Sequence, residues 1–279
     1  MSKITELLGW NELPAELISS LIVATVMIVL ALVIFIKTRH VNPLDKPRGI
    51  VHLAEICVSF ADKEVKEIMG PAFEGFGSYV LALALFILFG FVFGMIGLPN
   101  IFQPYSDEFL QPLPNPFTNV ASTLALALCT FTLVHFTAIR VNHWGYFKRY
   151  VKPFAVFLPI NLVTMWSPVL SLTLRLFGNA LAGYFVITLI YVGFSGLFDS
   201  TMAGLAFTPL LSPFAHLYFD IFDGLIQMTV FVMLTMLYVS QEYISPEDLA
   251  AAKRDKALLK EQKAQLKAQR HKKNEALKI

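Results

Sequence analysis

The chain has 279 residues, of which 56% are hydrophobic and only 15% are charged, and its formal net charge is +2. A soluble domain usually carries about a quarter charged residues, so this composition excludes an ordinary soluble domain and indicates a chain that is dissolved in lipid. The near-neutral charge argues against a nucleic-acid-binding protein. Cys57 and Cys129 lie in different segments, and two isolated thiols form neither a disulfide framework nor a metal-ligand set. We therefore expect no metal and no cofactor.

Five apolar segments reach the roughly 20 residues that a helix needs to cross the hydrocarbon of a bilayer. They are 17–36, 76–97, 117–139, 154–195 and 213–240. The sequence thus predicts an all-α integral membrane protein with five transmembrane helices. The fourth segment is longer than one straight crossing requires, so we expect it to be tilted or kinked. Pro159 and Pro168 lie in its first half, and each removes a helix hydrogen bond.

The first apolar segment is too long for a typical signal-peptide core, and no small-residue cleavage site follows it. Lys37, Arg39 and His40 come directly after it instead. We expect a retained membrane helix.

The basic residues predict the orientation, because short cytoplasmic loops collect Lys and Arg. They follow the first, third and fifth segments: Lys37, Arg39, Lys46 and Arg48, then Arg140, Lys148, Arg149 and Lys152, then the tail. Loops 98–116 and 196–212 contain no Lys or Arg. The expected division is therefore 1–16 outside, 17–36 spanning, 37–75 cytoplasmic, 76–97 spanning, 98–116 outside, 117–139 spanning, 140–153 cytoplasmic, 154–195 spanning, 196–212 outside, 213–240 spanning and 241–279 cytoplasmic. We expect the plasma (inner) membrane of a bacterium.

Two cytoplasmic stretches have helical character of their own. Residues 50–69 repeat apolar side chains at spacings of three and four, which predicts an amphipathic helix that either lies at the membrane interface or packs on its neighbours. Residues 247–279 hold ten basic and five acidic residues, a net charge of +5. This tail is either a solvated helix that reinforces the topology or a docking arm for a partner.

The polar residues inside the apolar segments carry the functional signal. Arg175 lies near the middle of the fourth segment, where an arginine costs about 2.5–3.5 kcal/mol on insertion scales and cannot lose its proton. It needs a carboxylate, a polar path, or both. Its helical face continues in small and polar residues, which are Ser167, Ser171, Asn179 and Gly183, with Gly178 and Ala182 beside them. Such a stripe packs either within the protein or against a closely approaching external helix.

The fifth segment supplies acidic counterparts on one helical face. His216, Asp220, Asp223 and Gln227 are separated by four, three and four residues. Two carboxylates in a membrane helix are costly unless they are hydrated or protonated, so they either line an ion path or neutralise Arg175 structurally.

The polar residues of these two segments lie toward opposite sides of the membrane. Asn161, Thr164, Ser167 and Ser171 lie on the cytoplasmic side of Arg175, whereas the polar residues of the fifth segment lie toward the outside. We infer two offset half-paths that end near mid-membrane. An ion crosses only if another component carries it between them.

Four runs of residues in this sequence resemble a known protein family. The run SLTLRLFGNALAG at 171–183 is similar to the signature of F-type ATP synthase subunit a. Three further runs are similar to the same family: FLPINL at 157–162, IQMTVFVMLTMLY at 226–238 and PNPFTNVASTLALAL at 114–128. The resemblance covers most of 45–243.

The resemblance implies a non-catalytic stator subunit that passes protons or sodium ions to and from the carboxylates of a rotating c-ring. It implies the peripheral-stalk subunit b, other ATP synthase subunits and the lipid bilayer as further partners. Arg175 matches the family's essential arginine, and Asn119, Asn179 and Gln227 match its polar positions. Asp220 matches a position in the outer half-channel.

The chain departs from the family pattern at a few positions. The family commonly has Glu or His where Tyr184 stands, so Asp223, one turn deeper than Asp220, is the alternative outer carboxylate. Thr164 stands where an acidic residue is often found, and Pro168 is displaced by one position. A stand-alone channel or transporter and a structural membrane scaffold are the other functional classes. The sequence does not choose between proton and sodium.

Overall fold

In the computed structural model, the described residues are 14–39, 49–73, 75–96, 113–142, 158–197 and 211–243. They form helices α2 (Ala15–Arg39), α3 (Ile50–Met69), α4 (Gly77–Ile96), α5 (Val120–Asn142), α7 (Leu158–Leu197) and α9 (Asp223–Gln241), with short helices η2 (Pro71–Phe73), η3 (Pro116–Thr118) and η6 (Leu217–Phe222). The basic tail 247–279 and most of the residues expected in the loops lie outside the described ranges.

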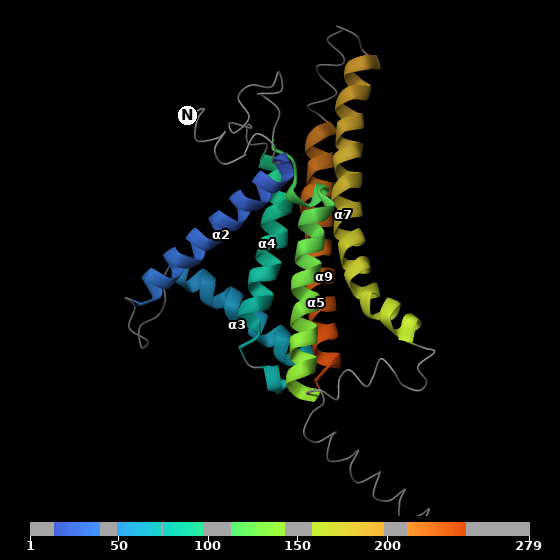
Figure 1. The fold of residues 1–279 in the computed structure, drawn as a ribbon. Helices are drawn as coiled ribbons and strands as arrows, with labels where there is room; N and C mark the ends of the chain where they lie inside the picture. Colours follow the sequence, from blue (N-terminus) through green and yellow to red (C-terminus); the bar gives the residue numbers. More distant parts are fainter. Residues whose placement is uncertain are drawn as a thin grey trace, which may run out of the picture.

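Among the residues that the structure describes, five helices are long and apolar enough to cross a membrane, which confirms the predicted fold class. These stretches are Ala15–Arg39, Gly77–Ile96, Val120–Val141, Val163–Ile190 and Leu211–Gln241. In Figure 1, α4, α5, α7 and α9 run side by side, while α2 leans away from them. The separation of α2 fits its surface, because most of its apolar side chains, such as Ile28 and Phe35, are exposed as lipid-facing residues are.

The fourth span is one 40-residue helix, α7, and only one of its two prolines lies beyond the first turn, in the helix interior. Pro159 is the second residue of α7, where the backbone N–H would have no helical partner in any case. The expectation that both prolines interrupt the helix is therefore wrong for Pro159. Pro168 lies in the helix interior, and Figure 1 shows α7 bending near its N-terminal end.

The sequence left open whether the amphipathic helix α3 lies at the membrane interface or packs on its neighbours, and each alternative fits one half of the helix. Ala61, Val65 and Met69 are buried, and α3 packs on α4 and α9. Leu53 and Ile56 remain exposed. The C-terminal half is thus part of the bundle, and the N-terminal half presents an apolar face.

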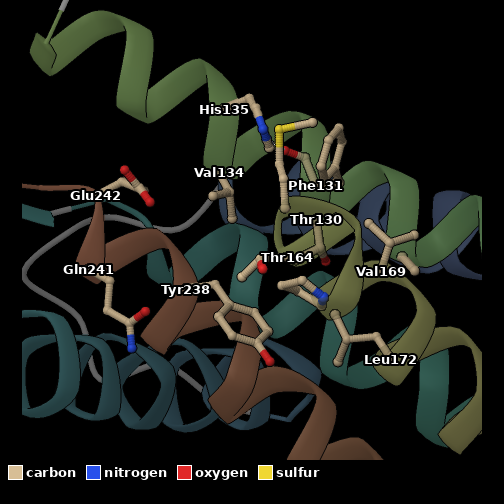
Figure 2. Close-up of a pocket in the computed structure, with 13 residues that line it drawn as sticks. Thr130, Phe131, Val134, His135, Thr164, Val169, Leu172, Tyr238, Gln241 and Glu242 are labelled. Atoms are coloured by element: carbon tan, nitrogen blue, oxygen red, sulfur yellow. Dashed lines mark hydrogen bonds between the residues drawn. The ribbon is translucent and has the colours of Figure 1, made fainter. Parts of the chain in front are cut away.

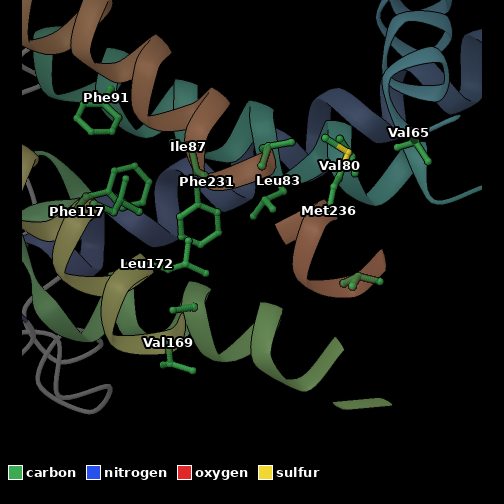
Figure 3. Close-up of a cluster of buried hydrophobic side chains, with 14 of the residues drawn as sticks. Val65, Val80, Leu83, Ile87, Phe91, Phe117, Val169, Leu172, Phe231 and Met236 are labelled. Atoms are coloured by element: carbon green, nitrogen blue, oxygen red, sulfur yellow. The ribbon is translucent and has the colours of Figure 1, made fainter. Parts of the chain in front are cut away.

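The core lies where α4, α5, α7 and α9 meet (Figure 3). Its centre contains Ile87, Phe91, Phe117, Leu172 and Phe231, all at most 2% exposed. Glycines allow this packing: a Cβ at Gly224 would lie 2.8 Å from Cβ of Phe91, and one at Gly90 would overlap the ring of Phe117. The close approach at Gly224 fixes the start of α9, and with it the acidic residues of the fifth span, against α4.

Candidate functional site

Arg175 is half-buried in the middle of α7, between the buried side chains of Leu172 and Leu176 and the exposed Leu174. Its Nη2 donates a hydrogen bond to Oγ of Ser171 at 3.3 Å. No carboxylate of the described residues lies within ion-pair distance of the guanidinium. Within the described chain, neither Asp220 nor Asp223 neutralises this positive charge. The interpretation of these carboxylates as a structural ion pair with Arg175 therefore finds no support.

A second polar contact joins the fourth and fifth spans. Nδ2 of Asn179 on α7 donates to Oδ1 of Asp223, the first residue of α9, at 3.4 Å. Asn179 lies one helical turn beyond Arg175, so this contact brings a carboxylate of the neighbouring helix to the C-terminal side of the arginine along α7. The structure thus brings these two predicted site residues together.

The third contact lies nearer the N-terminal end of the fifth span. Nδ1 of His216 lies 2.6 Å from Oδ2 of Asp220, and the Asp220 residue is 9% exposed. Asp220 belongs to η6, which has π-helical geometry, a geometry that often marks functional sites. This distortion has no signal in the sequence, because the spacing of the polar residues is also that of an ordinary α-helix. The histidine and the nearly buried carboxylate form one polar unit.

The remaining predicted site residues have different environments. Gln227 is buried at 6% exposure, one turn beyond Asp223 on the same helix. Asn119 caps the start of α5, where its Oδ1 accepts a hydrogen bond from the backbone N–H of Ala121 at 2.8 Å. Tyr184 is 50% exposed, and its hydroxyl makes no hydrogen bond to the acidic residues of the described chain. The structure therefore does not bring Asn119 and Tyr184 into the group around Asp220 and Asp223.

The stripe of small residues beside Arg175 divides into two parts. Gly183 is buried, and a Cβ there would lie 3.2 Å from Cβ of Phe219 in η6. Gly178 is exposed, and a Cβ there would meet nothing within 4 Å. The buried part of the stripe, at Gly183, packs within the chain, and the exposed part, at Gly178, leaves room for a close external neighbour.

A cavity of about 340 Å³ lies between α5, α7 and α9 (Figure 2). Its lining includes Thr130 and His135 on α5, Thr164 on α7, and Tyr238 on α9, with Glu242 directly after α9. Sequence reasoning missed the α5 and α9 contributions. Polar residues scattered along apolar helices give no signal of which neighbour they will face, and threonines in such helices often bond their own backbone. Among the described residues, no cluster of His, Cys, Asp or Glu is suited to hold a metal ion.

Comparison with known proteins identifies the family. The family model described as ATP synthase A chain matches residues 17–240. The chain belongs to the ATP synthase subunit a family. It is 34% identical to ATP synthase subunit a of Limosilactobacillus fermentum (85% of this chain, 95% of that protein) and 32% identical to that of Staphylococcus saprophyticus (85% and 96%). It is 26% identical to the sodium-ion-specific subunit a of Propionigenium modestum (78% and 72%).

This membership has direct consequences for the chain. It is a multi-pass membrane protein that acts in ATP synthesis and ion transport and associates with other ATP synthase subunits.

Proposed function

We propose that the chain is the non-catalytic stator subunit that passes protons or sodium ions to and from a rotating c-ring through two offset half-channels. The observation that carries this proposal is the environment of Arg175. Among the described residues, the guanidinium has Ser171 as its only hydrogen-bond partner and no ion-pairing carboxylate. A charge at this depth requires a counter-charge, and a carboxylate on an approaching ring helix supplies one.

The outward surface of α7 supports a partner at this place. Leu170 and Leu174 are 56% and 59% exposed, and Gly178 follows on the same face with open space above it. A helix of the ring docks against this surface and places its carboxylate near Arg175. The arginine attracts the deionised carboxylate and prevents ions from passing directly between the two half-channels.

The outer half-channel runs through the two polar contacts of the fifth span. The ion meets the His216–Asp220 unit first and then Asp223, which Asn179 holds from α7. Gln227 closes this path at its deep end. Asn119 and Tyr184 remain predicted site residues by family resemblance, with Asn119 capping α5.

The orientation follows from the basic residues. Lys37 and Arg39 end α2, and Arg140 lies in the last turn of α5. Figure 1 places these helix ends at the same end of the bundle as α3. We assign this end to the cytoplasm of a bacterium, with the N-terminus outside and the C-terminus inside. The peripheral-stalk subunit b is a further partner.

Site-specific photo-cross-linking tests the docking surface. A photoreactive side chain at Leu174 in the assembled synthase is expected to form an adduct with the ring subunit. The control position is Ile28 on α2, which is 68% exposed and faces away from the bundle, and no ring adduct is expected there. Lipid adducts alone at Leu174 would contradict the proposal and favour a stand-alone channel or a scaffold.

A further inference from the structure

An open groove lies on the surface of the bundle between α4 and α5. Among the described residues, it is lined by Tyr79 near the start of α4 and by one side of α5, which contributes Leu128, Cys129, Thr132, Leu133 and Phe136. Its volume of about 430 Å³ falls in the range of about 300–1,000 Å³ that is usual for ligand pockets. The groove is left between the two helices because α5 packs mainly on α7, whereas α4 packs mainly on α9 and α3.

The wall of this groove is suited to a hydrocarbon chain. Leu128 and Phe136 are 36% and 53% exposed within the membrane-spanning part of α5. The hydroxyl of Thr132, which is the one hydroxyl on the α5 wall, donates to the carbonyl of Leu128 at 2.8 Å and is satisfied within its own helix. A polar ligand would therefore gain little from the α5 wall, whereas an acyl chain needs no hydrogen-bond partner.

A cation stands at one end of the groove. One face of α5 carries, at spacings of four residues, Leu128, Thr132, Phe136 and Arg140. The guanidinium carbon of Arg140 lies 4.9 Å from the centre of the Phe136 ring, and this cation–π contact holds the charge beside the groove. Among the described residues, no carboxylate pairs with Arg140. The charge is thus open to an external anion, and the planar guanidinium matches the geometry of a phosphate.

The length of this face fits a lipid in one leaflet of the bilayer. From Leu128 to Arg140 the helix rises about 18 Å, at about 1.5 Å per residue. The hydrocarbon of one leaflet is about 15 Å thick, half of the roughly 30 Å of the bilayer. Arg140 lies in the last turn of α5, at the end of the bundle that we assign to the cytoplasm. The cytoplasmic leaflet is also the one whose anionic lipids attract basic residues.

We propose that this groove binds the acyl chain of an anionic phospholipid and that Arg140 holds the phosphate of its headgroup. The chain runs from Arg140 toward mid-membrane and contacts both α4 and α5, so the lipid fills the gap between the two helices. This inference goes beyond ion translocation, because none of these residues belongs to the proposed ion path. A membrane helix of another subunit is the alternative occupant, and the experiment below distinguishes the two.

Photo-cross-linking with lipid probes tests the groove in the complete synthase. The probes are phosphatidylglycerol and phosphatidylcholine with the same diazirine-bearing acyl chain, each added in trace amount to vesicles of phosphatidylcholine that contain the synthase. After illumination, peptide mass spectrometry locates the adducts. Residues 128–136 are expected to carry about fivefold more adduct from the anionic probe, because one basic side chain attracts a negative headgroup by about that factor. The exposed Ile28 on α2 is the internal control, where both probes are expected to react equally.

The variant Arg140→Gln is expected to lower the ratio of the two probes at 128–136 to about one, and Arg140→Lys is expected to keep most of the preference because it keeps the charge. Arg39→Gln is the matched control, since Arg39 lies in the last turn of α2, outside the groove, and its loss should change nothing there. Equal labelling by both probes in the native protein, or a preference that persists in Arg140→Gln, would overturn the proposal. So would the absence of lipid adducts at 128–136 while α2 is labelled, which would show that another subunit covers the groove.

Discussion

Replacement of Gly178 by leucine is expected to change the stability of this chain and its interaction with the docked ring in opposite directions. Gly178 is exposed on α7, one turn beyond Leu174, and a Cβ there meets nothing within 4 Å. Within the chain, a leucine therefore has room. Because glycine is about 0.8–1.0 kcal/mol less favourable than alanine in a helix and leucine is close to alanine, the helix gains up to about 1 kcal/mol.

The effect on a docked ring is opposite in sign. A small residue lets helix backbones approach closely, and a leucine holds the partner at an ordinary interaxial distance of about 8–10 Å. If the ring carboxylate moves from about 4 Å to about 7 Å from Arg175, their attraction falls from about 4 to about 2.4 kcal/mol at an effective dielectric constant of 20. The loss of nearly 2 kcal/mol corresponds to roughly a twentyfold weaker interaction.

Two assays on Gly178→Leu measure these effects. Thermal unfolding of the detergent-solubilised chain is expected to be unchanged or slightly later, and ATP-driven uptake in assembled vesicles is expected to fall on the order of twentyfold. Gly193→Leu is the matched control, because that glycine of α7 also has nothing within 4 Å and lies far from Arg175. Normal uptake with Gly178→Leu, or equal losses for both variants, would refute the proposed docking face.

Three further changes have distinct expected results. Asn179→Leu removes the donor to Asp223 and should lower uptake about tenfold at equal assembly, as one lost hydrogen bond to a charged group implies; unchanged uptake would remove this contact from the outer path. Tyr184→Phe should leave uptake within about twofold, because its hydroxyl contacts none of the described acidic residues; a large loss would return the tyrosine to the path. Gly90→Val should destabilise the chain by about 1–3 kcal/mol, measured as earlier thermal unfolding, because Phe117 fills the space that the new side chain needs; full stability would show that the core is looser there.

The sequence was sufficient for the spans and for the central arginine. Apolar length predicts the five membrane helices, because the hydrocarbon imposes that length on any crossing helix. Arg175 was identifiable for a similar reason. A permanent charge in an apolar segment costs free energy in the membrane, so it indicates a functional residue. The sequence also predicts a polar face on each of the fourth and fifth spans, and the Asn179–Asp223 contact joins those faces.

Other features depend on which helix packs where, and the one-dimensional pattern does not contain that information. Gly178 and Gly183 look equivalent in a stripe of small residues, yet only Gly183 meets Phe219. The π-helical turn around Asp220 has the spacing of an α-helix in sequence. The cavity depends on the simultaneous positions of Thr130, Thr164 and Tyr238 on three helices, together with Pro168 in the interior of α7.

The central claim is that Arg175 couples ion movement to a partner's carboxylate. The direct measurement is ATP-driven ion uptake into inside-out vesicles, comparing the native protein with Arg175→Ala at equal assembly of the synthase. The account predicts that coupled uptake disappears while the complex remains intact, because the partner's carboxylate has lost its counter-charge. Normal uptake with the variant would contradict the mechanism and would make the polar residues of α7 and α9 structural.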